Sequence, residues 1–279
     1  MKLTKGHGTQ NDFLLLEDLE GAVALAPAAV RALCDRRAGV GADGVLRVVR
    51  SENDPEGKAM AAEAPFFMDY RNADGSVAEM CGNGVRVFLR YLMARSLVEQ
   101  DAAVATRGGI RRAHARPDGD ITVGMGSPRV LADRPIATAA PLAPTPGTAL
   151  EIPNPHVVVP VATPGELAAL DLSGPPGVEP PLPHGQNVEF TVRLGPRHLR
   201  MRVHERGSGE TWSCGTGICA AAVAAALADG AERDGSTWQV DVPGGTCRVT
   251  WRPDGELELT GPAVLVAEIE VDDAWLRTA

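Results

Sequence analysis

The stretch GGIRRAHARPDGDITV (residues 108–123) returns in a second version, GGTCRVTWRPDGELEL (residues 244–259). Both versions begin with two glycines and place an arginine four positions after the first. Both continue with Arg-Pro-Asp-Gly and a segment of alternating apolar residues. An Asp-Gly pair between two alternating segments predicts a β-hairpin in each version. A repeat of this kind indicates that the chain is built from two related halves.

Further segments recur in the same order in both halves. Each half has a strand pattern that begins with asparagine, a short helix pattern, and two more strand patterns that lead towards a cysteine. The matched pairs are NDFLLLED from Asn11 and NPHVVVPV from Asn154, residues 27–37 and 164–172, ADGVLRVV and QNVEFTVRL, and FFMDY and LRMRVHE. Together with the hairpins, these matches predict an α+β fold made of two pseudo-symmetric, homologous domains.

The domain boundary is predicted within residues 129–150, a proline- and alanine-rich stretch that cannot form one regular element throughout. We therefore expect an N-terminal domain of residues 1–128 and a C-terminal domain of residues 129–264. Residues 265–279 have no counterpart in the first half, and we expect them to cross back and pair with the N-terminal domain. A second proline-rich stretch, residues 173–186, is expected to be a loop.

The composition restricts the class of protein. The chain has 279 residues and a formal net charge of −9 at pH 7. This acidic balance disfavours binding to nucleic acid or to an acidic membrane, since both need a basic face. The first residues, MKLTKGHGTQNDF, lack the apolar core of a secretion signal, and the longest apolar run is too short to span a bilayer. Five cysteines without a disulfide-scaffold spacing fit a reducing compartment, so we expect a cytoplasmic protein.

A cysteine stands directly before a glycine-rich turn and a helix pattern in each half: Cys81 in MCGNGVRVFLRYL and Cys214 in SCGTGICAAAVAAAL. The N-terminus of a helix stabilises a thiolate, and we expect it to lower the thiol pKa from about 8.5 to about 3.5–7.5. The same backbone N–H groups can hold a carboxylate. Each half is therefore predicted to carry a thiol base beside an anion-binding turn.

Two such turns on opposite sides of a domain cleft would suit the inversion of an α-carbon. One thiolate removes the α-proton, and the opposite thiol supplies a proton to the other face. The remaining cysteines, Cys34, Cys219 and Cys247, are expected to pack in the core. The spacing of Cys214 and Cys219 lacks a second ligand pair, so we expect no metal site.

These residues and the blocks around them resemble the diaminopimelate epimerases nearly from end to end. The blocks are KGHGTQNDF, RRAGVGADGV, YRNADGSVAEMCGNGVR, NPHVV, NVEF, ERGSGETWSCGTGICA and VPGG, in family order. The resemblance implies domains of mostly antiparallel strands wrapped around a central helix, with the active site in the cleft between them. It implies conversion of LL-2,6-diaminopimelate to the meso form in lysine and peptidoglycan precursor biosynthesis. It also implies that the enzyme needs no cofactor, neither pyridoxal phosphate (PLP) nor a metal, with a homodimer as the candidate assembly.

The resemblance also assigns roles to single residues. Cys81 and Cys214 match the catalytic pair, while His156 and Glu205 match residues that help to set thiol protonation. The residues that match contacts to the reacting end of the substrate are Asn11, Gly82, Asn83, Gly215 and Thr216. Those that match contacts to the distal amino-acid end are Asn72, Asn154, Asn187 and Arg206, and Glu205 belongs to the substrate-binding set as well. An arginine can pair with a carboxylate through two parallel hydrogen bonds, which suits a substrate with a second charged centre.

The sequence departs from the family pattern at two positions, and its residues bear on three other possible functions. Gly44 stands where some members have glutamine, and Val87 where many have a further cysteine. A proline or hydroxyproline racemase also uses two cysteines. Its substrate has a single carboxylate, however, and would not need Arg206 and three asparagines to bind a second charged end. A non-catalytic ligand-binding relative would be expected to have lost one thiol, and both are present. A redox protein would carry a Cys-x-x-Cys signature, which is missing.

Overall fold

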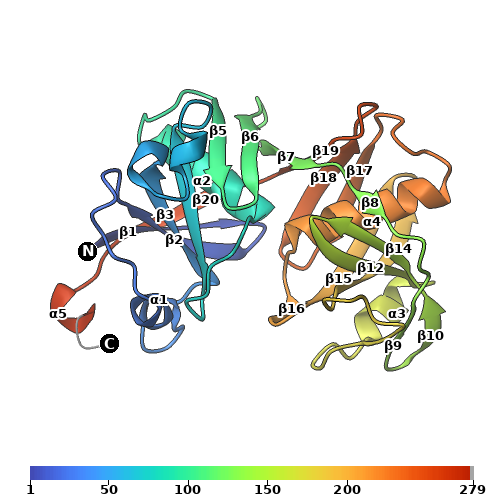
Figure 1. Cartoon of the computed structure of the whole chain (residues 1–279). Coiled ribbons are helices and arrows are strands. Elements are labelled where there is room, and N and C mark those ends of the chain that lie inside the picture. The colour runs from blue at the N-terminus through green and yellow to red at the C-terminus, as the bar shows by residue number, and fades with distance from the viewer. Residues whose placement is uncertain (277–279) are drawn as a thin grey trace. The chain divides into compact units, whose positions relative to one another are not determined.

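The computed structural model describes residues 1–276, which form two compact units (Figure 1). Unit 1 consists of Met1–Val123 with the segment from Gly261 onward, and unit 2 consists of Gly124–Thr260. The chain passes from unit 1 to unit 2 at Gly124, a few residues before residue 129, where the C-terminal domain was predicted to begin. Both units contain many strands and few helices, so the predicted α+β class with two repeated domains is confirmed.

Unit 1 is built around the helix α2 (Gly82–Ala94), which contacts β1 to β6 and β20. Val85, Phe88, Leu89 and Leu92 recur at helical spacing and are fully buried, so this helix fills the centre of the unit. Neighbouring strands are antiparallel, except for the parallel pairs β2–β3 and β4–β5. The other elements of the unit are β1 (Lys2–Gly8), β2 (Asn11–Glu17), α1 (Pro27–Cys34), β3 (Gly44–Arg50), the 3-10 turns η1 (Ser51–Asn53) and η2 (Lys58–Met60), β4 (Phe66–Asn72), β5 (Asp101–Thr106), β6 (Gly109–Ala115), β7 (Ile121–Gly126), β20 (Val264–Glu270) and α5 (Asp273–Leu276).

Unit 2 repeats this plan around the helix α4 (Gly215–Ala228), which contacts β11, β12, β14, β15, β17 and β18. Alanine makes up half of α4, and its small side chains let strands approach the helix on several sides. Among its buried residues are Ile218, Cys219 and Val223. The other elements are β8 (Arg129–Val130), β9 (Ile136–Ala139), β10 (Leu142–Pro146), β11 (Thr148–Ile152), β12 (Asn154–Pro160), α3 (Pro164–Ala169), β13 (Gly177–Glu179), β14 (Asn187–Gly195), β15 (His198–Glu205), β16 (Gly209–Thr211), β17 (Thr237–Val242), β18 (Gly245–Trp251) and β19 (Leu257–Gly261).

The repeated stretch forms the same hairpin in both places, as predicted. Strand β6 pairs with β7, and β18 pairs with β19, each antiparallel. The glycine of each Asp-Gly pair lies in the left-handed region, with φ 90° at Gly119 and φ 93° at Gly255. A side chain strains this conformation, which explains why glycine stands at this position in both turns.

The second proline-rich stretch holds more regular structure than expected, whereas the first forms several short strands and no single element. The stretch around the predicted boundary contains β8 to β11, and the stretch predicted as a loop contains β13. Strand β13 pairs with β9, which pairs with β10, so that these three form a small separate sheet. The loop prediction is therefore wrong at Gly177–Glu179, because non-local pairing orders a segment that its local sequence leaves open.

The last strand, β20, pairs antiparallel with β1, with Lys2 opposite Glu270 and Thr4 opposite Glu268. Strand β1 pairs with β2 on its other side. The end of the chain thus completes the sheet that its beginning starts.

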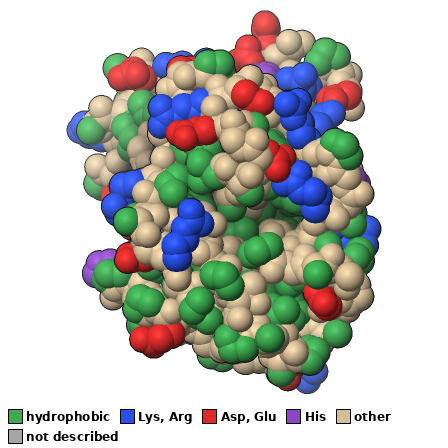
Figure 2. Space-filling model, turned by 90° about the vertical axis from the view of Figure 1, so that its right-hand side faces the viewer, with side chains coloured by type: hydrophobic (Ala, Val, Ile, Leu, Met, Phe, Trp, Pro, Cys, Tyr) green, Lys and Arg blue, Asp and Glu red, His purple; other side chains and the backbone are tan. Residues whose placement is uncertain are grey.

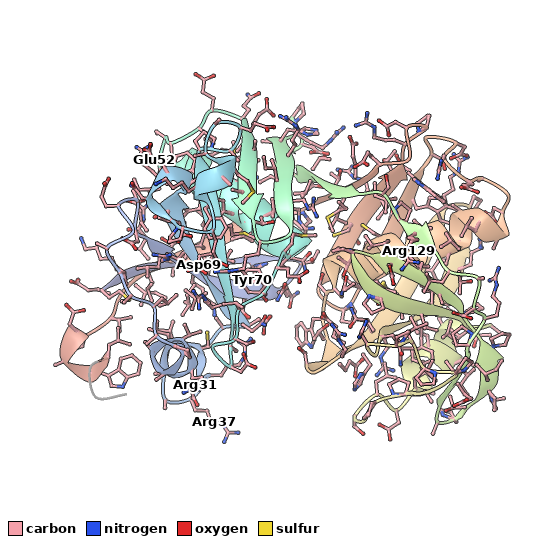
Figure 3. The ribbon with its side chains drawn as sticks, viewed as in Figure 1. Arg31, Arg37, Glu52, Asp69, Tyr70 and Arg129 are labelled. Atoms are coloured by element: carbon pink, nitrogen blue, oxygen red, sulfur yellow. The ribbon has the colours of Figure 1, made fainter. Side chains whose placement is uncertain are left out.

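A buried group of charges in unit 1 surrounds Asp69 on β4, which is labelled in Figure 3. Its carboxylate accepts hydrogen bonds from Arg47 Nε at 3.0 Å, Arg71 Nε at 2.8 Å and Arg107 Nη2 at 2.7 Å. Burial opposes ionisation, but the hydrogen bonds from Arg71 and Arg107 outweigh it and lower the pKa of Asp69 below its usual value of 3.8.

The face of the molecule drawn in Figure 2 carries Lys and Arg side chains interspersed with Asp and Glu and with hydrophobic side chains. None of the helices within residues 1–276 has the length and apolar character that crossing a bilayer requires.

Candidate active site

In unit 1 Cys81 is the N-cap residue of α2, with φ −143° and ψ 117°. Its Sγ accepts a hydrogen bond from the backbone N–H of Gly84 at 3.4 Å and donates one to Asn11 Oδ1 at 3.6 Å. The thiol therefore takes the place that a serine or aspartate side chain usually takes at a helix start. Cys81 is partly exposed, whereas Cys214 is buried.

The amide of Asn11 connects this thiol to its surroundings. Its Oδ1 also accepts a hydrogen bond from Asn83 Nδ2 at 3.2 Å, and its Nδ2 donates to Asp43 Oδ2 at 2.7 Å. Cys81, Asn11 and Asn83 are thus brought together as the sequence predicts. Asp43 was missed, although it lies in the block RRAGVGADGV, and it orients the Asn11 amide so that its oxygen faces the sulfur.

Asn72 and Gly44 lie opposite each other in the β3–β4 register. The Asn72 side chain donates a hydrogen bond to Ser76 Oγ at 3.0 Å. A Cβ atom on Gly44 would lie 2.4 Å from the backbone oxygen of Arg71 and 2.7 Å from the Tyr70 ring. The backbone of β4 occupies the space of a side chain here, which accounts for the glycine at this position.

In unit 2 Cys214 is the N-cap residue of α4 and is buried, at 5% exposed. Its Sγ accepts a hydrogen bond from the backbone N–H of Gly217 at 3.4 Å and lies 3.4 Å from Thr216 Oγ1. Asn187 Nδ2 approaches the same sulfur at 4.0 Å. The two cysteines therefore have the same position at their helices, and the second is more enclosed.

Two carboxylates act on Cys214, those of the half-buried Glu205 and the fully buried Glu189. Glu205 hydrogen-bonds with the thiol and with the hydroxyl of Thr211, and burial is the main cause that raises the pKa of Glu205. Burial, then the charges of Glu205 and Glu189, raises the pKa of Cys214 well above its usual value.

The expected lowering of the thiol pKa is therefore wrong for Cys214. A helix end contributes about 0.3–1 kcal/mol at exposed sites. Two unit charges 4 Å apart interact by about 4 kcal/mol at an effective dielectric constant of 20. The neighbouring carboxylates and burial thus outweigh the helix end.

His156 lies in a fully buried group that the sequence analysis identified only in part. Its Nδ1 is 2.7 Å from Glu189 Oε1, and its Nε2 is 3.1 Å from Asn154 Oδ1. Both His156 and Glu189 are 0% exposed. Glu189 was missed, and the signal for it was the single acidic residue in the strand pattern QNVEFTVRL.

The predicted distal contacts of unit 2 are Asn154, Asn187 and Arg206. Asn187 Oδ1 accepts a hydrogen bond from the backbone N–H of Arg206 at 2.9 Å. The guanidinium of Arg206 donates to the backbone oxygen of His184, in the loop before β14. Asn187 thus connects the distal set to the sulfur of Cys214.

Gly217→Ala is expected to destabilise the protein by about 1–3 kcal/mol, the usual cost of overpacking a core. A Cβ atom on Gly217 would lie 2.6 Å from Glu189 Oε1. The matched control is Gly84→Ala, whose Cβ would meet its nearest atoms at 3.4 Å or more. Urea unfolding measures both, and alanine at position 84 should be tolerated because it favours a helix. Equal stability of the two variants would contradict the prediction.

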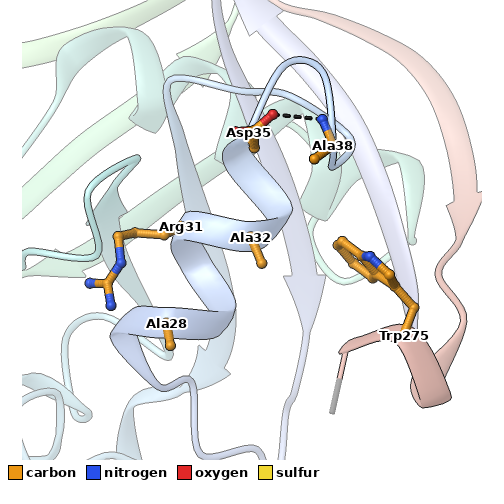
Figure 4. A pocket seen from close by; sticks show the side chains of 6 residues that line it. All are labelled: Ala28, Arg31, Ala32, Asp35, Ala38 and Trp275. Carbon is orange, nitrogen blue, oxygen red and sulfur yellow. Dashed lines mark hydrogen bonds between the residues drawn. The ribbon is translucent and has the colours of Figure 1, made fainter. Parts of the chain in front are cut away.

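A hollow of about 320 Å³ on unit 1 lies between α1 and α5 (Figure 4). Ala28, Arg31 and Trp275 contribute to its lining. It contains none of the predicted site residues, so we give it no part in the reaction. Among residues 1–276, no group of three or more His, Cys, Asp and Glu side chains is arranged to hold a metal ion.

The chain thus has a duplicated α+β fold with a cysteine at the start of each central helix. Solved structures share this fold at low sequence identity. A hydroxyproline epimerase from Agrobacterium vitis is 15% identical with a TM-score of 0.68, covering 98% of this chain and 94% of that chain. A phenazine biosynthesis protein of the PhzF family from Bacillus anthracis is 16% identical with a TM-score of 0.67, covering 98% and 99%.

Sequence comparison is more specific. The family model described as diaminopimelate epimerase matches residues 3–131 and 148–266. The diaminopimelate epimerase of Streptomyces coelicolor is 57% identical, covering 98% of this chain and 96% of the relative. That of Thermobifida fusca is 50% identical, covering 99% of this chain and all of the relative. The chain therefore belongs to the diaminopimelate epimerase family, a family of isomerases.

Proposed function

We propose that the protein converts LL-diaminopimelate to meso-diaminopimelate with Cys81 and Cys214 as its two proton-transferring groups. The observation that carries this proposal is the pair of cysteines, each an N-cap residue whose sulfur accepts an N–H from the first helical turn. Family membership supplies the substrate. The same proposal places the enzyme in lysine and peptidoglycan precursor biosynthesis, in the cytoplasm and as a homodimer.

The reaction needs two proton transfers on opposite faces of one carbon. One sulfur, as thiolate, takes the α-proton, and the electron pair of the broken C–H bond moves towards the carboxylate. The other sulfur, as thiol, gives its proton to the opposite face of the carbon. One proton enters and one leaves, so the enzyme ends with its thiol and thiolate exchanged and is ready for the reverse direction.

The helix starts suit the charge that develops on the substrate. Gly82, Asn83, Gly215 and Thr216 occupy first-turn positions of α2 and α4. Backbone N–H groups of a first turn have no partner within the helix and favour an anion. In our proposal they hold the reacting carboxylate, where negative charge increases in the transition state. All the chemistry then comes from side chains and backbone, so the proposal needs neither PLP nor a metal.

The distal end of the substrate is assigned to Asn72, Asn154, Asn187 and Arg206. In our proposal the guanidinium of Arg206 leaves the backbone oxygen of His184 and pairs with the distal carboxylate. The asparagine amides both donate and accept, which suits an amino group beside a carboxylate. A proline-type substrate has no second charged centre for this set.

The test is proton exchange in D₂O with reduced protein and no added cofactor. With LL-diaminopimelate we expect the meso product to carry solvent deuterium at the inverted α-carbon. Proline serves as the competing substrate, and we expect it to exchange no α-proton. Exchange with proline and none with diaminopimelate would move the protein to the proline racemase class, and exchange with neither would favour a ligand-binding role.

A further inference from the structure

The turn between β1 and β2 holds two residues in the left-handed region. Gly8 pairs with Asn11 across this hairpin, and the two residues between them, Thr9 and Gln10, have φ 49° and φ 62°. Glycine and asparagine adopt this conformation readily, whereas a β-branched residue such as threonine is strained in it. A strained turn of this kind persists only where its surroundings hold it, and such turns cluster at active sites.

The side chain of Arg86 lies against this turn. Arg86 belongs to α2, and its Nη2 donates a hydrogen bond to Thr9 Oγ1 at 3.1 Å. Both residues are 0% exposed. A Cβ atom on Gly8 would lie 3.1 Å from the same Nη2 and 3.0 Å from the backbone oxygen of Asn83, so the hairpin packs directly on the first turn of the helix. Arg86 therefore connects the central helix of unit 1 to the strained threonine.

The burial of Arg86 is only partly compensated by hydrogen bonds. Its Nε donates to the backbone oxygen of Pro262 at 3.3 Å, and its Nη1 is buried without a hydrogen-bond partner in the part of the chain that the structure describes. A buried donor without a partner is destabilising. The stability of the core therefore gives no reason for an arginine at this position, and the contact with Thr9 points to a role in holding the turn.

Asn11 directly follows the turn, so the conformation of the turn determines where its side chain lies. The amide oxygen of Asn11 is 3.6 Å from Cys81 Sγ and 3.2 Å from Asn83 Nδ2. In a two-residue hairpin the turn fixes the register of the strands on either side. A change of conformation at Thr9 or Gln10 would therefore displace the Asn11 amide from both contacts.

The second half of the repeat provides a comparison. In unit 2 a single residue, Pro153, stands between Ile152 and Asn154, which pair with each other. The ring of proline fixes φ near −65°, so it cannot adopt the left-handed conformation. Five positions after the N-cap cysteine, α4 has Cys219 where α2 has Arg86. At these places in unit 2, all of them described by the structure, neither the left-handed turn nor the arginine occurs. The two features are thus present together in one unit and missing together from the other.

We propose that Arg86 is a positioning residue: it holds Thr9 and Gln10 in the left-handed conformation and so keeps the Asn11 amide against Cys81. The inference rests on the proposed function and deepens it, because it adds a residue outside the predicted site to those that prepare the site for reaction. Arg86 acts through the turn and takes no part in the proton transfers.

The test is a double-mutant cycle between Arg86 and the turn. Arg86→Met removes the hydrogen bond to Thr9, and we expect kcat for LL-diaminopimelate to fall about 10-fold or more while KM stays within about 3-fold. Combining Thr9→Gly with Gln10→Gly lets the turn adopt the left-handed conformation without strain, and this pair alone should keep kcat within about 3-fold of wild type. In that background we expect Arg86→Met to lower kcat by less than about 3-fold. An equal loss in both backgrounds, or no loss in the folded Arg86→Met protein, would overturn the proposal.

Thr9→Val tests the same contact from the other side, should Arg86→Met fail to fold. Valine keeps the branched shape and removes the hydroxyl, so we expect kcat to fall about 3-fold or more. Thr9→Ser restores the hydroxyl and should keep kcat within about 2-fold of wild type. The matched control is Arg90→Met on the same helix, whose guanidinium donates to the backbone oxygens of Ala263 and Gly119 and which should also stay within about 2-fold. Wild-type kcat in Thr9→Val, or an equal loss in Thr9→Ser, contradicts the proposed role of the hydrogen bond.

The side-chain amide of Asn11 supplies a measurement that needs no substrate. Its NMR signals in nitrogen-labelled protein are assigned by comparison with Asn11→Asp. We expect Arg86→Met to shift or broaden these signals, and the added glycine pair at positions 9 and 10 to return them towards their wild-type positions. Signals that stay in place in Arg86→Met would show that Arg86 does not position Asn11. Because this measurement is independent of turnover, failure of the positioning role and failure of the proposed function give different results.

Discussion

Cys81→Ser and Cys214→Ser are each expected to lower the rate of inversion of LL-diaminopimelate by about 10²–10⁴-fold, the usual contribution of a positioned acid or base. Serine keeps the size of the side chain and still accepts the N–H of the first helical turn, so the helix start should survive. Its hydroxyl is a far weaker acid than a thiol, so at neutral pH it supplies almost no anion to remove the α-proton and is a poor proton donor to carbon. The loss should therefore appear in kcat while the fold remains intact.

Cys34→Ser is the matched control for both variants. Cys34 is buried at the end of α1, and burial raises the pKa of its thiol to about 11. It is therefore a core residue with an inert thiol, and its replacement should leave kcat within about 2-fold, with at most a modest loss of stability. If either Cys81→Ser or Cys214→Ser inverted LL-diaminopimelate at the wild-type rate, the two-thiol mechanism would be ruled out.

The largest expected loss of stability comes from Asp69→Ala, at about 3–5 kcal/mol, the cost of breaking a buried ion pair by removing one partner. Asp69 is 1% exposed and accepts hydrogen bonds from three arginines, of which Arg47 and Arg107 are themselves about nine-tenths buried. Without the carboxylate these guanidinium groups stay buried with fewer partners. Urea unfolding measures the effect, with the exposed Glu52→Ala as a control expected within about 0.5 kcal/mol of wild type.

The lowered pKa of Asp69 also predicts how the stability of the folded protein depends on pH. The pKa of Asp69 is lower in the folded protein than the unfolded value of 3.8. Its contribution to stability is therefore complete well above pH 3.8 and is lost as the pH falls through the folded pKa. The stability difference between wild type and Asp69→Ala should shrink on acidification. A difference that stays constant down to the acid unfolding transition would show that Asp69 acts through packing rather than charge.

The fold was predictable because its strongest signals are local and occur twice. The Asp-Gly hairpins, the asparagines that begin β2 and β12, and the cysteines before the two helices each appear in both halves. The small sheet of β9, β10 and β13 was not predictable, because its strands are short and β13 pairs with β9 across a long sequence separation. Local sequence carries little information about such pairing.

The predicted site residues were found through short blocks, and the structure brings several of them together, such as Cys81 with Asn11 and Asn83. Glu189 was hidden because a single acidic residue in a strand can face either solvent or the interior. The repeat offered the missing clue, since its counterpart is Leu46, a core residue. The high pKa of Cys214 could not be predicted either, because it depends on how two carboxylates from different strands pack around the sulfur.

The pairing of β20 with β1 has a consequence for the order in which the protein assembles during synthesis. Unit 2 is continuous in sequence and ends at Thr260, so all its strands are available before the chain is finished. Unit 1 needs β20, and its sheet stays open at β1 until the ribosome has added residue 270. Synthesis of unit 1 thus begins before that of unit 2, but its sheet is completed only after all of unit 2 has been made. Until then, β1 presents an unpaired edge to every other nascent chain nearby.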